Sequence, residues 1–282
     1  MTLTGHAKLA GVIGWPVSHS LSPRLHGFWL DRYGIDGAYV PMAVAPENFA
    51  LALKSLAYLG FAGANLTVPH KEAGLAAVDE IDDIARRVGA VNTVVVQSDG
   101  RLFGTNTDVF GFSENLREAA PAWRASAGPA VVLGAGGAAR AVCVALIDAG
   151  APELRLVNRT AERAAVLARE IGGPIRVHVW KDRGPALAGA NCLVNTTALG
   201  MSGKPGLDID LSDLPRTALV HDIVYAPLTT PLLAAAQERG NPVATGIGML
   251  LHQARPGFRA WFGVDPEVTA DLRRHVLQGL SG

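Results

Sequence analysis

Two serines stand on alternate residues, Ser20 and Ser22, between an apolar strand expected at 10–13 and a helix expected at 25–32. Two hydroxyls with this spacing suit a ligand that carries a carboxylate or several hydroxyl groups. Pro23 suits the first turn of the helix, and Ser22 suits its N-cap. A purely structural role is therefore available to Ser22 but not to Ser20.

A second polar group, Asn65, Thr67 and Lys71, follows a strand that begins near residue 60. Ligands of an α/β sheet bind beyond the carboxyl ends of its strands, so these side chains are candidates for ligand binding. The helix dipole disfavours a lysine at the start of a helix. The placement of Lys71 therefore favours a chemical role over that of a solvated surface charge.

Two more polar positions follow further along the chain. Asn92 lies in a strand expected at 89–96, after an acid-rich helix around 79–83, and a hairpin turn is expected at 98–100. Asp108 stands where a helix is expected to begin, and it could simply cap that helix.

A glycine-rich turn, Gly134-Ala-Gly136-Gly-Ala-Ala139, joins a β-branched strand at 131–133 to an Ala-rich helix at 138–149. This is the G-x-G-x-x-A pattern of dinucleotide-binding proteins. Gly134 permits the sharp turn, Gly136 lets the backbone approach a pyrophosphate, and Ala139 lets the helix pack closely on the sheet. The N–H groups at the helix start would hold the phosphates.

The residues after the next strand, 154–157, indicate which dinucleotide binds. The NAD pattern places an acidic residue there, about 20 residues beyond the glycines, to bind the ribose 2′-hydroxyl. This chain has Asn158-Arg159-Thr160 instead, and Arg163 follows one helical turn later. A guanidinium can bind a 2′-phosphate with two parallel hydrogen bonds. The sequence therefore predicts NADP(H).

Composition excludes several classes of protein. The 282 residues suffice for two domains, and 49% hydrophobic with 18% charged residues is typical of a well-packed globular chain. The formal net charge is zero, so no basic field favours nucleic acid or an anionic membrane. No apolar run approaches the ~18 residues that span a bilayer, and no signal peptide is visible.

The cysteines are consistent with a reducing cytoplasm, and the histidines give no support to metal catalysis. Cys143 and Cys192 have no C-x-x-C spacing, so we expect buried, unpaired thiols in a reducing compartment. The eight histidines are scattered, and no metal site is predicted.

The elements in order predict an α/β fold with two domains. Further strands are expected at 37–44, 175–179, 192–194, 218–222 and 243–245, and helices at 46–59, 109–118, 246–261 and 266–280. The first domain is an α/β substrate domain, and the second is a doubly wound, Rossmann-type domain for the dinucleotide.

Six motifs, in order and over nearly the whole chain, resemble those of the shikimate dehydrogenase family. They are Gly14-Trp-Pro-Val-Ser-His-Ser20-Leu-Ser22-Pro23, Asn65-Leu-Thr67-Val-Pro-His-Lys71, Gly89-Ala-Val-Asn92-Thr93, Gly104-Thr-Asn-Thr-Asp108, the glycine turn with Asn158-Arg159-Thr160, and Gly246-Ile-Gly-Met-Leu-Leu-His-Gln253. The first motif runs on to His26-Gly27 where many relatives have His-Asn. The family reduces 3-dehydroshikimate to shikimate with NADPH, on the route to chorismate and the aromatic amino acids.

The resemblance implies the roles of individual residues. Lys71 and Asp108 match the catalytic pair, and the substrate residues would be Ser20, Ser22, Asn65, Thr67, Asn92, Tyr225 and Gln253. The cofactor would contact Gly134, Ala135, Gly136, Gly137, Ala138, Asn158, Arg159, Thr160, Arg163, Thr196, Ile223, Gly246 and Met249. Lys71 would supply a proton to the alkoxide formed by hydride transfer, with Asp108 orienting its ammonium group.

The same resemblance implies the domain limits. Residues 1–108 and 246–282 would form the substrate domain, and residues 109–245 the Rossmann NADP domain, with the C-terminal helices returning to the first. A monomer or a homodimer is expected.

Three alternatives stay open at this point. A quinate or quinate/shikimate dehydrogenase would share these motifs, although some such relatives use NAD and carry an acidic residue where Arg159 stands. A related enzyme could act on an aminated analogue of shikimate. A non-catalytic ligand sensor on the same fold is disfavoured because Lys71 and Asp108 are both present.

Overall fold

A computed structural model describes residues 2–280, and its contacts divide the chain into two compact units. The first unit comprises residues 1–107 and 253–282, and the second residues 108–252. The C-terminal helices return to the N-terminal unit, as predicted. Helix α9 (Gly246–Phe262) begins in the second unit and ends in the first. Its first turn packs in the second unit because Gly248 lies against the Asn115 side chain.

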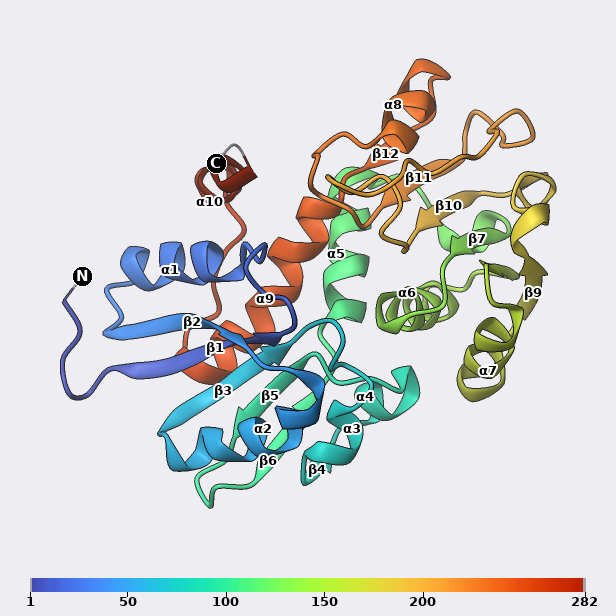
Figure 1. The fold of residues 1–282 in the computed structure, drawn as a ribbon. Helices are drawn as coiled ribbons and strands as arrows, with labels where there is room; N and C mark the ends of the chain where they lie inside the picture. The colour runs from blue at the N-terminus through green and yellow to red at the C-terminus, as the bar shows by residue number, and fades with distance from the viewer. Residues whose placement is uncertain (1, 281–282) are drawn as a thin grey trace. The chain divides into compact units, whose positions relative to one another are not determined.

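The first unit is built on a six-stranded mixed sheet (Figure 1). The spatial order is β2-β1-β3-β5-β6-β4, with β1 parallel to β2 and β3, and β5 antiparallel to β3 and β6. The strands are β1 (Lys8–Gly14), β2 (Gly37–Ala43), β3 (Phe61–Leu66), β4 (Glu80–Ile81), β5 (Thr93–Val96) and β6 (Leu102–Thr105). The predicted hairpin joins β5 to β6, with Gly100 at a φ of 85°.

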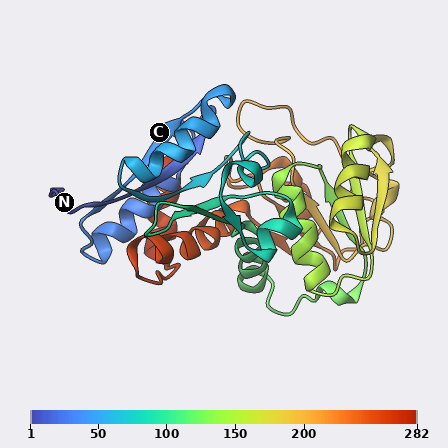
Figure 2. The same cartoon turned by 90° about the horizontal axis from the view of Figure 1, so that it is seen from below.

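Helices cover both faces of this sheet. Helices α1 (Ser22–Arg32) and α10 (Ala270–Leu277) lie on one face and α2 (Phe49–Tyr58) on the other, as Figures 1 and 2 show. The α2 face buries Phe49, Leu53 and Leu56 against the strands. Two short helices, α3 (Gly74–Ala77) and α4 (Asp83–Val88), follow β3, and 3-10 turns occupy Pro46–Asn48 and Gln278–Leu280.

Two local predictions for this unit were wrong. The acid-rich stretch at 79–83 is not a helix but contains β4, because its carboxylates bond to backbone. Asp79 accepts from the Leu102 N–H at 2.7 Å, and Asp82 caps α4 by accepting from the Ala85 N–H at 2.7 Å. Ser22 is not an N-cap, since Leu21 holds that position and α1 has no side-chain cap.

The second unit has a six-stranded, all-parallel sheet in the doubly wound order β12-β11-β10-β7-β8-β9. The strands are β7 (Ala130–Leu133), β8 (Leu154–Asn158), β9 (Ile175–Val179), β10 (Cys192–Asn195), β11 (Leu219–Asp222) and β12 (Val243–Ala244). The direction of winding reverses between β7 and β10, which is where ligands bind in such sheets. This confirms the predicted two-domain α/β fold with a Rossmann-type second domain.

The strands β7, β10 and β11 of this sheet are buried on both faces. Ala130 and Val132 face one core, with α5 (Asp108–Ala119), α6 (Gly137–Asp148) and α7 (Ala161–Ile171). Val131 and Leu133 face the other, with α8 (Pro231–Glu238) and the 3-10 turn Pro185–Leu187. Two further 3-10 turns lie at Ala125–Ala127 and Trp180–Asp182. Parallel strands that are covered on both sides are expected to be continuous apolar runs, whose successive side chains point into the two cores in turn.

Both cysteines lie in the core of the second unit as free thiols, as predicted. Burial raises the pKa of Cys143 to about 12 and raises the pKa of Cys192 further, so both stay protonated. Among residues 2–280, no helix is long and apolar enough to cross a membrane. The same residues hold no group of three or more potential metal ligands.

Candidate active site

The buried amides of the first unit form one hydrogen-bonded network. Asn65, at the end of β3, donates from Nδ2 to the backbone oxygen of Asn92 at 3.1 Å and to Thr93 Oγ1 at 3.0 Å. Asn92 donates from Nδ2 to Thr107 Oγ1 at 3.0 Å and to Gln253 Oε1 at 3.3 Å. The structure therefore brings together three predicted substrate residues that lie far apart in the sequence.

The orientation of the Asn92 amide is determined by its neighbours. Its Oδ1 accepts from the Thr107 N–H at 2.7 Å and from Thr93 Oγ1 at 3.0 Å, while Nδ2 faces the Gln253 oxygen. A side-chain amide with its oxygen on donors and its nitrogen on acceptors has one satisfied orientation. Thr93 and Thr107 were not predicted as site residues, although both stand in the quoted motifs.

Tyr39, which sequence analysis missed, also belongs to this network. The Tyr39 hydroxyl donates to Asn65 Oδ1 at 2.6 Å. Ser20 Oγ accepts from the Ser22 N–H at 3.3 Å. Ser20 therefore has the structural role at the helix start that its sequence position did not suggest. No motif marks Tyr39, which lies within β2.

Lys71 and Thr67 follow β3 in a turn. The Thr67 N–H donates to the backbone oxygen of Ile13 at 2.9 Å, and the Lys71 backbone oxygen accepts from the Val91 N–H at 2.8 Å. Lys71 is therefore tied through its backbone to the residue before Asn92. Asp108 is the first residue of α5 and belongs to the second unit, as does Tyr225, whose pKa burial raises.

The glycine turn has the backbone that the dinucleotide pattern requires. Gly134 has a φ of 109°, and a Cβ there would lie 2.6 Å from Thr196 Oγ1. Gly136 is the N-cap of α6, in extended conformation, and a Cβ there would meet nothing within 4 Å. No side chain caps this helix start. The open backbone and uncapped N–H groups fit the pyrophosphate of a dinucleotide.

Three strands of the same sheet, β8, β10 and β11, end in an Asn or Asp whose side chain bonds to the residue two positions on. Asn195 Oδ1 accepts from the Thr197 N–H at 3.0 Å, and Asp222 Oδ1 accepts from the Val224 N–H at 3.0 Å. Asn158 Nδ2 donates to the Thr160 backbone oxygen at 2.7 Å. The residues inside these turns are Arg159, Thr196 and Ile223, all predicted cofactor contacts.

The remaining predicted cofactor residues have different environments. Arg159, Thr160 and Arg163 are exposed at the end of β8 and the start of α7. Gly246 packs so closely against the backbone of Ile223 that a Cβ at position 246 would overlap it. Met249 lies in the core beside α5 and α6.

Asp222 anchors the loop that carries Ile223 and Tyr225. Its second oxygen accepts from Thr230 Oγ1 at 2.7 Å, and Asn195 Nδ2 donates to its first oxygen at 3.0 Å. Burial raises the pKa of Asp222, although these hydrogen bonds oppose that shift. The pair of Asn195 and Asp222 thus ties the loops after β10 and β11 together.

Comparison with known proteins gives the family. The family model described as the shikimate dehydrogenase substrate binding domain matches residues 12–94, and that described as shikimate/quinate 5-dehydrogenase matches residues 119–200. A shikimate dehydrogenase (NADP(+)) of Paramagnetospirillum magneticum is 61% identical over 275 residues, covering 98% of this chain and 100% of that protein. The chain belongs to the shikimate dehydrogenase family.

Solved structures of this family are similar over the whole chain. A shikimate 5-dehydrogenase of Thermus thermophilus, in complex with NADP(H) and shikimate, is 39% identical with a TM-score of 0.84, covering 97% of this chain and 98% of that one. A quinate dehydrogenase of Corynebacterium glutamicum, in complex with NAD, is 33% identical with a TM-score of 0.89, covering 96% and 99%. Family membership therefore leaves the choice between shikimate and quinate to residues of this chain.

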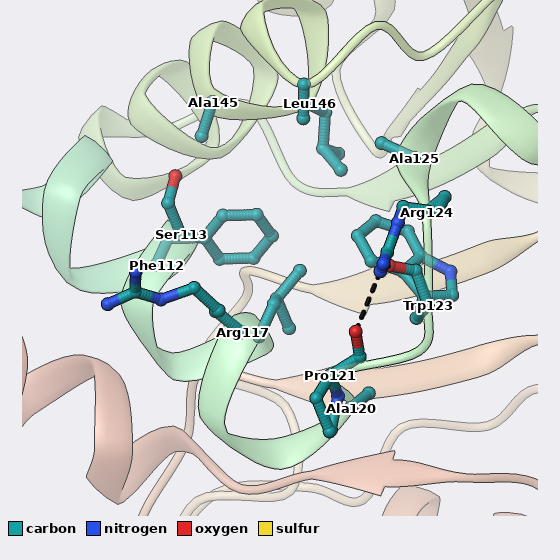
Figure 3. A pocket seen from close by; sticks show the side chains of 12 residues that line it. Phe112, Ser113, Arg117, Ala120, Pro121, Trp123, Arg124, Ala125, Ala145 and Leu146 are labelled. Atoms are coloured by element: carbon teal, nitrogen blue, oxygen red, sulfur yellow. Dashed lines mark hydrogen bonds between the residues drawn. The ribbon is translucent and has the colours of Figure 1, made fainter.

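One cavity of the second unit lies away from the predicted site. It has a volume of about 190 Å³ and lies between α5, α6 and the segment after α5 (Figure 3). Phe112, Leu116 and Leu146 make its wall apolar, and the Arg124 guanidinium beside it donates to the Pro121 backbone oxygen at 2.7 Å. It contains none of the predicted site residues, so cavity volume does not mark the chemistry here.

Proposed function

We propose that this chain is an NADP-dependent shikimate dehydrogenase, an oxidoreductase that interconverts 3-dehydroshikimate and shikimate in the biosynthesis of chorismate and the aromatic amino acids. The observation that carries the proposal is the 61% identity to a shikimate dehydrogenase (NADP(+)) over essentially the full length of both chains. The network of Asn65, Asn92 and Gln253 supports it, because a polyhydroxylated ring needs several fixed polar partners.

Lys71 and Asp108 are the proposed catalytic pair. Bound NADPH would supply the hydride to the substrate ketone. The Lys71 Nζ donates a proton to the resulting alkoxide and takes it back in the reverse direction, a role worth roughly 10²–10⁴ in rate. Asp108 orients the ammonium group. The turn after β3, which ties the Lys71 backbone to Val91, supports this placement beside the amide network.

The other substrate residues bind and orient. Ser20 and Ser22 are proposed to hold the carboxylate of the substrate, and the remaining substrate residues are proposed to bind its hydroxyl groups. These are Asn65, Thr67, Asn92, Tyr225 and Gln253.

The proposed cofactor is NADP(H), held by the glycine turn and by Arg159. Gly134 to Ala138 would receive the pyrophosphate, and Arg159 with Arg163 the 2′-phosphate. Both arginines are exposed, so a phosphate can reach their guanidinium groups without displacing buried partners. Asn158 and Thr160 shape the turn around Arg159, and Thr196, Ile223, Gly246 and Met249 complete the proposed contacts.

The second candidate is a quinate/shikimate dehydrogenase, which the similarity to a quinate dehydrogenase favours. That relative binds NAD, whereas this chain has an arginine where the NAD pattern requires an acidic residue. Arg159 therefore supports the NADP-dependent, biosynthetic reaction.

One experiment separates these functions. Purified protein is given shikimate or quinate together with NADP⁺ or NAD⁺, and the ultraviolet absorbance of the reduced nicotinamide is followed. We expect fast reduction of the cofactor only in the mixture of shikimate and NADP⁺. Equal turnover with quinate, or with NAD⁺, would instead assign the protein to the quinate-using branch. A folded protein that reduces neither cofactor in any of the four mixtures would instead favour the hypothesis of a non-catalytic ligand sensor.

We further propose that the enzyme acts in the cytoplasm as a monomer or homodimer. The two buried, protonated thiols suit a reducing compartment, since neither is paired in a disulfide. Light scattering of the purified protein at two concentrations would give the oligomeric state.

A further inference from the structure

Tyr39 spans the first sheet from its edge to the substrate residues. It lies on β2, and its partner across the ladder on β1 is the small Ala10. Because Ala10 leaves room above the strand, the Tyr39 ring crosses β1, and its hydroxyl donates to Asn65 Oδ1 on β3 at 2.6 Å. Burial raises the pKa of Tyr39 well above its ordinary value, so this hydroxyl keeps its proton.

Aromatic rings hold Tyr39 in this position. The His26 ring lies flat against it, with centroids 3.9 Å apart and planes 5° from parallel, and Trp261 lies 5.9 Å away. Among the described residues, neither ring nitrogen of His26 has a hydrogen-bond partner. His26 therefore contributes a neutral flat surface rather than a charge, and that surface fixes the plane of the Tyr39 ring.

The hydrogen bond between Tyr39 and Asn65 has one direction, because the Tyr39 hydroxyl donates its proton to Asn65 Oδ1. Asn65 in turn uses both N–H groups, one on the Asn92 backbone oxygen and one on Thr93 Oγ1. A carbonyl oxygen accepts two hydrogen bonds, and Tyr39 occupies one of them. The acceptor left on Asn65 is the second lone pair of Oδ1.

We propose that Tyr39 is a positioning residue of the substrate site: it fixes the Asn65 amide so that Asn65 offers only a hydrogen-bond acceptor to the ligand. This inference rests on the proposed function. An acceptor binds a hydroxyl and repels a ketone oxygen. Asn65 is therefore suited to a substrate hydroxyl that stays a hydroxyl throughout the reaction, and not to the carbon that is oxidised and reduced.

The test is Tyr39→Phe, which removes the hydroxyl and keeps the ring on His26. Without the fixed donor, the Asn65 amide can turn its N–H groups to the ligand, and one neutral hydrogen bond to shikimate is lost in part. We expect the KM for shikimate to rise about fivefold, with kcat within about twofold and the KM for NADP⁺ unchanged. Tyr58→Phe is the matched control, because Tyr58 is 91% exposed in the same unit.

A second variant reaches Asn65 from its other side. Thr93→Val removes the Oγ1 acceptor while keeping the shape of the side chain, and it also removes the donor to Asn92 Oδ1. The KM for shikimate should rise in this variant too, even if Tyr39→Phe fails to fold. An unchanged KM for shikimate in either folded variant overturns the inference. So does a fall in kcat with KM unchanged, which would mean only a loss of active protein.

A readout without catalysis separates this inference from the proposed function. In two-dimensional ¹H–¹⁵N spectra without ligand, the Asn65 side-chain amide signal should shift in Tyr39→Phe and stay in place in Tyr58→Phe. If the wild-type protein does not oxidise shikimate, the proposed function fails, while this spectrum still decides whether Tyr39 fixes Asn65. An Asn65 signal that is the same in all three proteins overturns the inference whatever the activity.

Discussion

The buried imidazole of His26 makes the first unit sensitive to acid. Its side chain is fully buried beside Tyr39, Trp29, Phe258 and Trp261. Burial alone lowers the pKa of His26 from 6.5 to about 3, because a charged imidazolium would lose its hydration there. The folded unit therefore keeps His26 neutral at pH values where the unfolded chain protonates it.

The sign and size of the effect follow from this difference. Because the folded pKa is depressed, the stability contributed by neutral His26 is fully present above pH 6.5 and is lost as the pH falls from there toward 3. Between pH 7 and pH 5 the unfolded chain gains most of one proton that the folded chain does not bind. The resulting loss in free energy of unfolding is about 2 kcal/mol, and about 5 kcal/mol over the full range.

The perturbation is His26→Leu, which removes the titrating group and keeps an apolar side chain of similar volume. Urea unfolding followed by tryptophan fluorescence at pH 5, 6 and 7 gives the free energy of unfolding of both proteins. Trp29 and Trp261 report on this core, since both rings lie within 6 Å of His26. The variant should gain about 2 kcal/mol relative to wild type between pH 7 and pH 5.

The exposed His6 supplies the control, because His6→Leu should leave the pH dependence of the wild-type protein unchanged. If the curves for His26→Leu and wild type stay parallel from pH 7 to pH 5, the folded unit accommodates a charged His26. The account of His26 as a neutral plate under Tyr39 would then be wrong.

Three further outcomes are expected. Lys71→Ala should lower kcat about 100-fold or more while weakening shikimate binding far less, and steady-state kinetics with undiminished turnover would refute its role. Arg159→Gln should raise the KM for NADP⁺ at least about tenfold and leave that for NAD⁺ nearly unchanged, whereas equal losses would show that Arg159 does not bind the phosphate. Asp222→Asn keeps an acceptor for the Val224 N–H and removes the carboxyl group, whose pKa is raised by burial. The protonated Asp222 side chain stabilises the folded wild-type protein at a pH below the ordinary Asp pKa, and this stabilisation is lost as the pH rises through the raised pKa of the folded state. The free energy of unfolding of the variant should therefore rise relative to that of wild type from pH 4 to pH 7. Urea unfolding that shows the opposite trend would contradict this prediction.

The glycine turn was predictable because its requirements are local. A left-handed φ at Gly134 and an open backbone at Gly136 depend on residues adjacent in the chain, and the flanking apolar runs showed a strand and a helix. The order of the parallel strands then follows from the general rules for doubly wound sheets. The second unit is therefore the part of the fold that sequence reasoning describes best.

The organisation of the substrate residues could not be predicted in the same way. Tyr39 lies 26 positions from Asn65, and Gln253 lies 161 positions from Asn92. Neither separation has a helical or strand period, and these side chains meet only through the packing of the mixed sheet with helix α9. The wrong N-cap assignment of Ser22 has a different cause. The helix begins one residue earlier than expected, with Leu21 as its N-cap, and helix boundaries are hard to place from sequence.

The ends of three parallel strands show how the second unit is prepared for a cofactor. The last residues of β8, β10 and β11, Asn158, Asn195 and Asp222, each bond through the side chain to the residue two positions on. Each bond closes a short turn and leaves the residue between, Arg159, Thr196 or Ile223, at its apex. Because these backbones are ordered before any ligand arrives, binding loses less conformational entropy there. These three polar side chains thus shape the turns at the strand ends, and the residues between, Arg159, Thr196 and Ile223, are among the proposed cofactor contacts.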